Sequence, residues 1–179
     1  MHAQAKYMTE HVIKTKMPYQ TELNILYGSS IGTAFACSAL GTKVNGVGID
    51  LVLLTTPFAN LVSGTGKWYV EWATGPIFEN VSYLINRGTV PVCALFGSLD
   101  TKLPPSVNMP ILKPLLYDCY EVEGVDHMFF STPGGITITA DYLGDQINDL
   151  WASLFYITVE PSTNALLSSS LSLPPEEEV

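Results

Sequence analysis

Positive charge is scarce in this sequence. Its 179 residues include eight Lys and Arg against 17 Asp and Glu, a formal net charge of −9. Nucleic acids and anionic membrane surfaces are recognised by clustered positive charge, so we expect neither as a partner. The sequence has no run of about 18 unbroken apolar residues, which argues against a membrane span. The first residues carry no apolar core of a signal peptide, so a cytoplasmic location is expected.

Cysteine and histidine are also few. The three cysteines are too few for a disulfide framework, and none stands in a Cys-x-x-Cys pair that would indicate a zinc ribbon. The three histidines, His2, His11 and His127, are too scattered to predict a metal site from their spacing. The sequence therefore predicts no metal and no cofactor.

Apolar residues, in contrast, are plentiful, at 47% of the chain against 14% charged residues. Short apolar runs alternate with helical patterns. Strands are predicted over 23–27, 47–55, 91–96 and 120–125, and helices over 2–16, 31–40, 68–73, 77–86, 112–117 and 141–156. This alternation indicates an α/β protein, a mostly parallel sheet with flanking helices. We expect one domain over residues 1–159 and an extended tail over 160–179.

The first predicted strand runs into Gly28-Ser29-Ser30-Ile31-Gly32, a G-x-S-x-G motif at a strand-to-helix junction. At such a junction the motif predicts a nucleophile elbow, because a sharp strand-to-helix turn exposes the central serine. Positions 28 and 32 are expected to require a small residue, because a larger side chain at either one would clash in the sharp turn. Ser30 is then a candidate nucleophile, and the Ile31 N–H a candidate donor to the oxyanion. The plain alternative is a Gly/Ser turn that opens a helix.

Two further candidates follow predicted strands. Asp100 comes after the run 91–96, and His127 comes after the run 120–125. Ligands of parallel sheets bind at the carboxyl ends of the strands, so both residues should face the same cleft as Ser30. Each has a plain alternative, an Asp in an ordinary turn and a structural His. The chain order Ser, Asp, His is nevertheless that of the α/β-hydrolase triad.

From about Leu23 to Phe155 the sequence resembles the C-terminal part of an α/β-hydrolase. The segments that carry the resemblance are the nucleophile strand and elbow at 26–33, the next core strand at 50–57, the acid turn at 90–104, the histidine loop at 123–129 and the final helix at 141–156. The resemblance implies Ser30 as nucleophile, His127 as general base and then acid, and Asp100 as the group that orients the imidazole. It implies a serine hydrolase that cleaves a carboxylic ester or thioester through an acyl-enzyme.

Two other carboxylates are rivals for the acid. Asp50 begins the core strand at 50–57 that carries the resemblance, so it should lie at the opposite end of the sheet. Asp126 adjoins His127 in sequence and should point away from it.

The stretch 58–87 is expected to form the lid and the wall of the acyl pocket. We predict Ser29, Trp68, Trp72 and Phe78 as substrate-pocket residues. The aromatic rings indicate a small substrate with an apolar or aromatic acyl group, while core packing is the alternative for each ring.

The resemblance has one large departure. The family places several strands before the elbow, and a loop among them supplies the second oxyanion N–H, whereas only 22 residues precede the first predicted strand here. The elbow strand should then be an edge strand, and we expect a companion chain or a homodimer to cover it. Two other classes stay open: a non-catalytic interaction subunit on a shortened hydrolase scaffold, and a β-rich viral coat protein.

Overall fold

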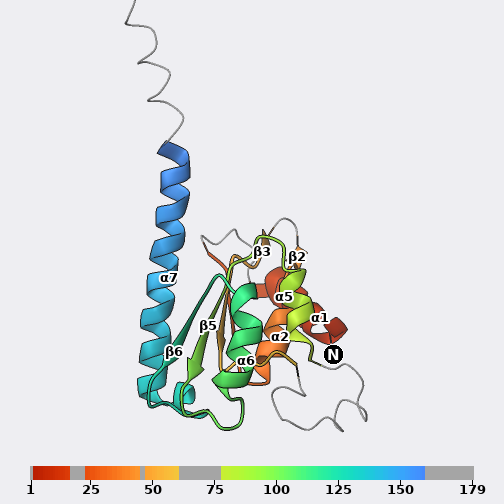
Figure 1. The fold of residues 1–179 in the computed structure, drawn as a ribbon. Helices are drawn as coiled ribbons and strands as arrows, with labels where there is room; N and C mark the ends of the chain where they lie inside the picture. Colours follow the sequence, from red (N-terminus) through yellow and green to blue (C-terminus); the bar gives the residue numbers. More distant parts are fainter. Residues whose placement is uncertain (1, 17–22, 45–46, 61–77, 160–179) are drawn as a thin grey trace, which may run out of the picture. The chain divides into compact units, whose positions relative to one another are not determined.

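The computed structural model describes residues 2–16, 23–44, 47–60 and 78–159 (Figure 1). The chain divides into two units, Met1–Thr139 and Ala140–Val179. The first unit holds the sheet and the helices around it. The last helix, α7 (Pro133–Val159), begins in the first unit and continues into the second. The predicted tail over 160–179 lies outside the described residues.

The central sheet is parallel throughout. Its four strands are, in spatial order, β1 (Ile25–Ser29), β4 (Leu51–Thr55), β5 (Val92–Gly97) and β6 (Asp118–Val122). The helices that connect them are α2 (Gly32–Ser38), α5 (Asn80–Ile85) and α6 (Pro105–Leu112), the last followed by a 3-10 turn (Lys113–Leu115). The remaining described elements are α1 (His2–Lys16), a short antiparallel pair, β2 (Lys43–Val44) with β3 (Val47–Gly48), and a 3-10 turn (Phe129–Ser131) after β6. The predicted α/β class is confirmed.

One face of the sheet packs on α2, α5 and α6, which Figure 1 shows together on one side of the strands. Alternate residues of β4 and β5 meet the helices in one buried cluster. Its members are Ala36, Cys37, Val52, Leu54, Ala59, Leu84, Val92, Ala94, Phe96 and Leu112. Every residue of β4 and β5 is buried, which is the pattern of central strands in a parallel sheet.

The three cysteines are free thiols. Burial raises the pKa of Cys37 from its ordinary 9.0 to about 12, and burial, followed by the nearby Asp118 charge, raises the pKa of Cys93 to about 12 as well. Burial also raises the pKa of the Cys119 thiol. Near neutral pH these side chains therefore stay protonated and behave as small apolar groups.

Several predicted elements differ from the structure. The last strand lies at Asp118–Val122 and the last helix begins at Pro133, while the helix predicted over 68–73 lies outside the described residues. The helix predicted over 112–117 is wrong, because the helix is α6 and residues 113–115 form the 3-10 turn that follows it. Pro105 can begin α6 because proline at the first helical position needs no N–H partner. The single strand predicted over 47–55 is divided into β3 and β4.

The β-rich alternative is also wrong for the part of the chain that the structure describes, because helices connect every neighbouring pair of parallel strands. None of the described helices combines the length and the apolar character needed to cross a membrane.

Candidate active site

Ser30 occupies a sharp turn between β1 and α2. Its backbone φ is 52°, in the left-handed region that residues other than glycine seldom adopt. The Ser30 N–H donates to the Thr55 carbonyl at 3.0 Å, which extends the β1–β4 ladder by one residue. The Ser30 carbonyl accepts the Thr33 N–H at 3.0 Å, which starts α2. Strand pairing and helix thus hold this strained residue from both sides.

The two motif glycines are not equivalent. A Cβ atom on Gly28 would lie 2.8 Å from the Ala36 Cβ and 2.8 Å from the Gly32 carbonyl oxygen, so β1 and α2 can approach each other only with glycine there. A Cβ atom on Gly32 would meet nothing within 4 Å. The expectation that Gly32 must be small to avoid a clash is therefore wrong, because its Cα faces open space.

The structure brings Ser30, His127 and Asp100 into one chain of hydrogen bonds. Ser30 Oγ lies 2.9 Å from His127 Nε2, and His127 Nδ1 lies 2.8 Å from Asp100 Oδ2. A carboxylate can only accept, so the imidazole proton sits on Nδ1 and leaves Nε2 free to accept the Ser30 hydroxyl proton. The Asp100 side chain is 1% exposed and the His127 side chain 12%, so most water is kept from the pair.

The second Asp100 oxygen is held by its own turn. Asp100 Oδ1 accepts the backbone N–H of Lys102 at 2.9 Å and that of Leu103 at 2.8 Å. These two bonds fix the plane of the carboxylate and leave Oδ2 for the imidazole.

The rival carboxylates are engaged elsewhere. Asp126 Oδ1 accepts the N–H groups of Met128 and Phe129, each at 3.0 Å, so this side chain closes its own turn. Asp50 Oδ2 accepts the Asn24 N–H at 2.8 Å, at the opposite end of the sheet from Ser30. Both placements agree with the sequence-based expectation.

A close backbone approach places the histidine loop. The Leu99 N–H donates to the Val125 carbonyl at 2.9 Å, which ties the turn after β5 to the loop that carries His127. A Cβ atom on Gly97 would lie 2.5 Å from the Val125 oxygen. Glycine at this position therefore lets the loop reach the end of β5.

Of the four predicted substrate-pocket residues, the structure describes two. Trp68 and Trp72 lie outside the described residues. Ser29 ends β1, next to Ser30, and is half-buried. Phe78 has a φ of 64° and is half-buried.

Phe78 belongs to an apolar cluster beside the elbow and the acid turn. It packs against the buried side chains of Ala34, Phe58 and Leu103. The Phe58 and Phe78 rings meet edge to face with centroids 6.3 Å apart. The cluster joins the helix after Ser30 to the turn after Asp100, and Phe78 is its only partly exposed member among the described residues.

The Ile31 N–H has no hydrogen-bond partner among the residues that the structure describes, so it is free to donate to a ligand. In the same part of the chain, no group of three or more His, Cys, Asp or Glu side chains could hold a metal ion.

Three buried polar residues near the elbow were missed by sequence reasoning. Thr33 and Asn80 form a hydrogen-bonded pair, and Thr56, with a φ of 47°, has a buried hydroxyl that lacks a partner within the described ranges. Thr33 could have been found, because a hydroxyl three residues after Ser30 can reach back to its carbonyl. No sequence pattern marks Asn80, since asparagine is usually exposed.

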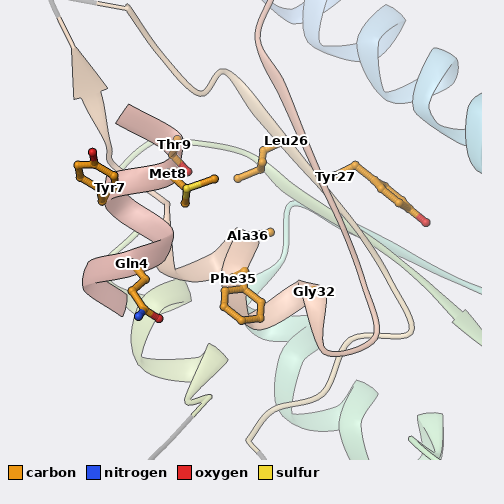
Figure 2. A pocket seen from close by; sticks show the side chains of 9 residues that line it. All are labelled: Gln4, Tyr7, Met8, Thr9, Leu26, Tyr27, Gly32, Phe35 and Ala36. Atoms are coloured by element: carbon orange, nitrogen blue, oxygen red, sulfur yellow. The ribbon is translucent and has the colours of Figure 1, made fainter. Parts of the chain in front are cut away.

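A groove lies on the other side of β1 (Figure 2). Within the described residues β1 pairs only with β4, so its second edge is open. The groove between α1, β1 and α2 has a volume of about 820 Å³, and Met8 and Leu26 point toward each other across it. The lining residues in the described part of the chain are all uncharged: Gln4, Tyr7, Met8, Thr9, Leu26, Tyr27, Gly32, Phe35 and Ala36.

The backbone direction along β1 follows from its pairing. The Asn24 carbonyl and the Ser30 N–H both bond toward β4. Successive residues of a parallel strand direct their hydrogen-bonding groups to alternate sides, so Ile25, Tyr27 and Ser29 present N–H and C=O to the open edge.

Several solved structures have a fold similar to that of this chain. An alpha/beta hydrolase enzyme from the metagenome of sediments from the lagoon of Mar Chica, Morocco, matches with a TM-score of 0.54 and 21% sequence identity, over 79% of this chain and 68% of that chain. The monoacylglycerol lipase of Paleococcus ferrophilus matches with a TM-score of 0.56 and 15% identity, over 80% and 74% of the two chains. The bromoperoxidase from Bacillus anthracis matches with a TM-score of 0.52 and 13% identity, over 77% and 71%.

These likenesses show that the chain has an α/β-hydrolase-like fold, here with a four-stranded parallel sheet. No protein-family model and no curated protein matches the sequence.

Proposed function

We propose that this protein is a serine hydrolase that cleaves carboxylic esters or thioesters through an acyl-enzyme on Ser30. The observation that carries the proposal is the unbroken chain of hydrogen bonds from Ser30 through His127 to Asp100. A serine hydroxyl is a weak nucleophile until an adjacent base takes its proton, and an ordered carboxylate keeps that base in the required tautomer.

In the first half of the reaction, Ser30 Oγ attacks the carbonyl carbon and its proton passes to His127 Nε2. The Ile31 N–H donates to the negative oxygen that forms. The bond to the leaving alcohol or thiol then breaks, and His127 returns the proton to that group. In the second half, water loses a proton to His127 and attacks the acyl-enzyme. The carboxylic acid leaves, and Ser30 Oγ regains its proton.

The half-buried Phe78, which packs on the buried Ala34, Phe58 and Leu103, supports an apolar acyl group as the substrate class. Trp68 and Trp72 remain predicted pocket residues.

Hydrolysis of p-nitrophenyl butyrate by the purified chain tests the proposal. Wild type should release p-nitrophenol, and Ser30→Ala should reduce the rate to that of buffer. Ser98→Ala is the matched control, because Ser98 is another serine at the carboxyl edge whose Oγ accepts the Gly124 N–H instead of contacting the imidazole. Equal rates for wild type and Ser30→Ala would refute the proposal.

We also propose that the open edge of β1 is an interface with a second copy of this chain. Three outward-facing residues of β1 have no strand partner among the described residues, and the adjoining groove is lined largely by apolar side chains. The described residues that line the groove are all uncharged, so two copies that each carry −9 could meet there without burying a charge from these residues. A two-fold axis would pair the two β1 strands antiparallel.

Sedimentation velocity tests this interface. The purified chain should sediment as a dimer. Ile25→Pro should give a monomer, because it removes an N–H from the open edge without touching the β4 ladder. A monomeric wild type would overturn the interface while leaving the hydrolase proposal intact.

A further inference from the structure

Two buried polar side chains, Thr33 and Asn80, stabilise the Ser30–Ile31 peptide through a chain of hydrogen bonds. Thr33 Oγ1 donates to the Ser30 carbonyl at 2.7 Å, in addition to the Thr33 N–H at 3.0 Å. Asn80 Nδ2 lies 3.3 Å from Thr33 Oγ1 and 2.7 Å from the Phe58 carbonyl oxygen. Thr33 and Asn80 are both 0% exposed, so water does not compete for these bonds.

The donor directions in this network are determined. Asn80 Nδ2 can only donate, so Thr33 Oγ1 accepts from it and directs its single proton to the Ser30 carbonyl. The Asn80 Oδ1 is buried without a partner among the described residues. Turning the amide over would place that oxygen against the Phe58 carbonyl, so the side chain keeps Nδ2 toward Thr33 although Oδ1 is left unsatisfied.

Because the Ser30–Ile31 peptide group is planar, the direction of its C=O determines the direction of its N–H. The described peptide bonds include no cis bond, so the Ser30 C=O and the Ile31 N–H point in opposite directions. Pinning the carbonyl on the buried side therefore fixes the direction of the Ile31 N–H on the other side, where no described residue accepts it. The Ser30 φ of 52° lies in a region that residues other than glycine seldom adopt, so this turn depends on the surrounding contacts to hold it.

We infer that Thr33, oriented by Asn80, is a positioning residue that aims the Ile31 N–H at the oxyanion. The inference rests on the proposed function and adds two residues that never touch the substrate. Both act through the peptide plane: Thr33 holds the carbonyl, and Asn80 keeps the Thr33 proton directed at it.

The decisive variant is Thr33→Val, which keeps the shape of the side chain and removes the hydroxyl. We expect kcat for p-nitrophenyl butyrate to fall about tenfold to a hundredfold, because a misdirected donor loses part of the roughly 10²–10³ in rate that one oxyanion donor supplies. KM should stay near the wild-type value. An alkylboronic acid, which forms a tetrahedral adduct on the serine, should lose affinity by the same factor as kcat.

Two variants control for a purely structural effect. Thr33→Ser restores the hydroxyl and should restore kcat. Ser38→Ala removes a bond of the same kind in the same helix, since Ser38 Oγ donates to the Phe35 carbonyl at 2.9 Å, and it should leave kcat and boronate affinity unchanged. Should Thr33→Val not fold, Thr33→Ala compared with Thr33→Ser makes the same measurement, because alanine is well suited to a helix.

The outcomes separate this inference from the proposed function. An active wild type with unchanged kcat in Thr33→Val overturns the inference alone. So does a loss of kcat that Thr33→Ser does not rescue, or one without a matching loss of boronate affinity. A wild-type chain that neither hydrolyses the ester nor binds the boronate overturns both.

Discussion

Replacing Asp100 by asparagine should remove most of the activity while the fold persists. The two turn N–H groups of Lys102 and Leu103 donate to Asp100 Oδ1, and an asparagine oxygen can take the same place. Its NH₂ group would then replace Oδ2, which lies 2.8 Å from His127 Nδ1. An amide NH₂ donates, so Nδ1 would have to accept and the imidazole proton would move to Nε2.

The reversed tautomer explains the size of the expected loss. With a proton on Nε2, His127 cannot accept the proton of Ser30, which lies 2.9 Å away. Such a wrong tautomer costs about 10⁴ in kcat in a serine triad, which is ~5 kcal/mol of activation free energy at about 1.36 kcal/mol per tenfold. The folded state keeps both turn hydrogen bonds, so we expect little change in the free energy of unfolding.

The assay is kcat for p-nitrophenyl butyrate, measured beside a urea denaturation curve for each variant. Asp126→Asn is the matched control, because it changes a carboxylate one residue from His127 that accepts only backbone N–H groups. Asp126→Asn should keep wild-type kcat. If Asp100→Asn stays within tenfold of wild type, or if both variants lose kcat equally, the assignment of Asp100 is wrong.

Three further predictions concern backbone packing and thiols. Gly97→Ala should lower kcat at least about tenfold in the same assay, because the new Cβ would lie 2.5 Å from the carbonyl of the histidine loop; wild-type kcat would contradict this. Gly28→Ala, with a Cβ at 2.8 Å from two atoms, should lower the free energy of unfolding by about 1–3 kcal/mol, whereas Gly32→Ala, with nothing within 4 Å, should not lower it in urea titrations. The pKa values of Cys37 and Cys93 rise from 9.0 to about 12 on folding, so the folded state keeps protons that the unfolded state releases above about pH 9. The free energy of unfolding should therefore fall between about pH 9 and 12 and be insensitive to these thiols below pH 9; a Cys37→Ala variant with the same alkaline slope would count against this.

Much of the candidate site can be predicted from sequence, because a parallel sheet brings the residues that follow its strands to one edge. Ser30, Asp100 and His127 each follow a strand that the local pattern identifies. Once the strands are parallel, their carboxyl ends share one edge, and residues 97 positions apart in sequence can meet. The rival Asp50 could be set aside by the same reasoning, because it lies at the start of its strand and not at the carboxyl end.

What the sequence could not predict depends on contacts between distant segments. The contact of Asn80 with Thr33 joins residues 47 positions apart and leaves no periodic signal. Gly32 has open surroundings because β1 is the edge strand of the described sheet. The G-x-S-x-G motif alone does not reveal this, because the same motif can also occur next to a central strand with packing on both sides. Helix α6 was misplaced because Pro105 and Pro110 look like turn residues, although both are accommodated within the helix.

The central claim is that Ser30 is the nucleophile, and mass mapping of a fluorophosphonate adduct tests it most directly. The reagent bonds to a serine that an adjacent base has activated, and His127 is the base within hydrogen-bond distance of Ser30. The account predicts one adduct per chain, located on Ser30 by peptide fragmentation and absent from Ser30→Ala. An adduct on another serine, or none in a sample that hydrolyses the ester, would contradict it.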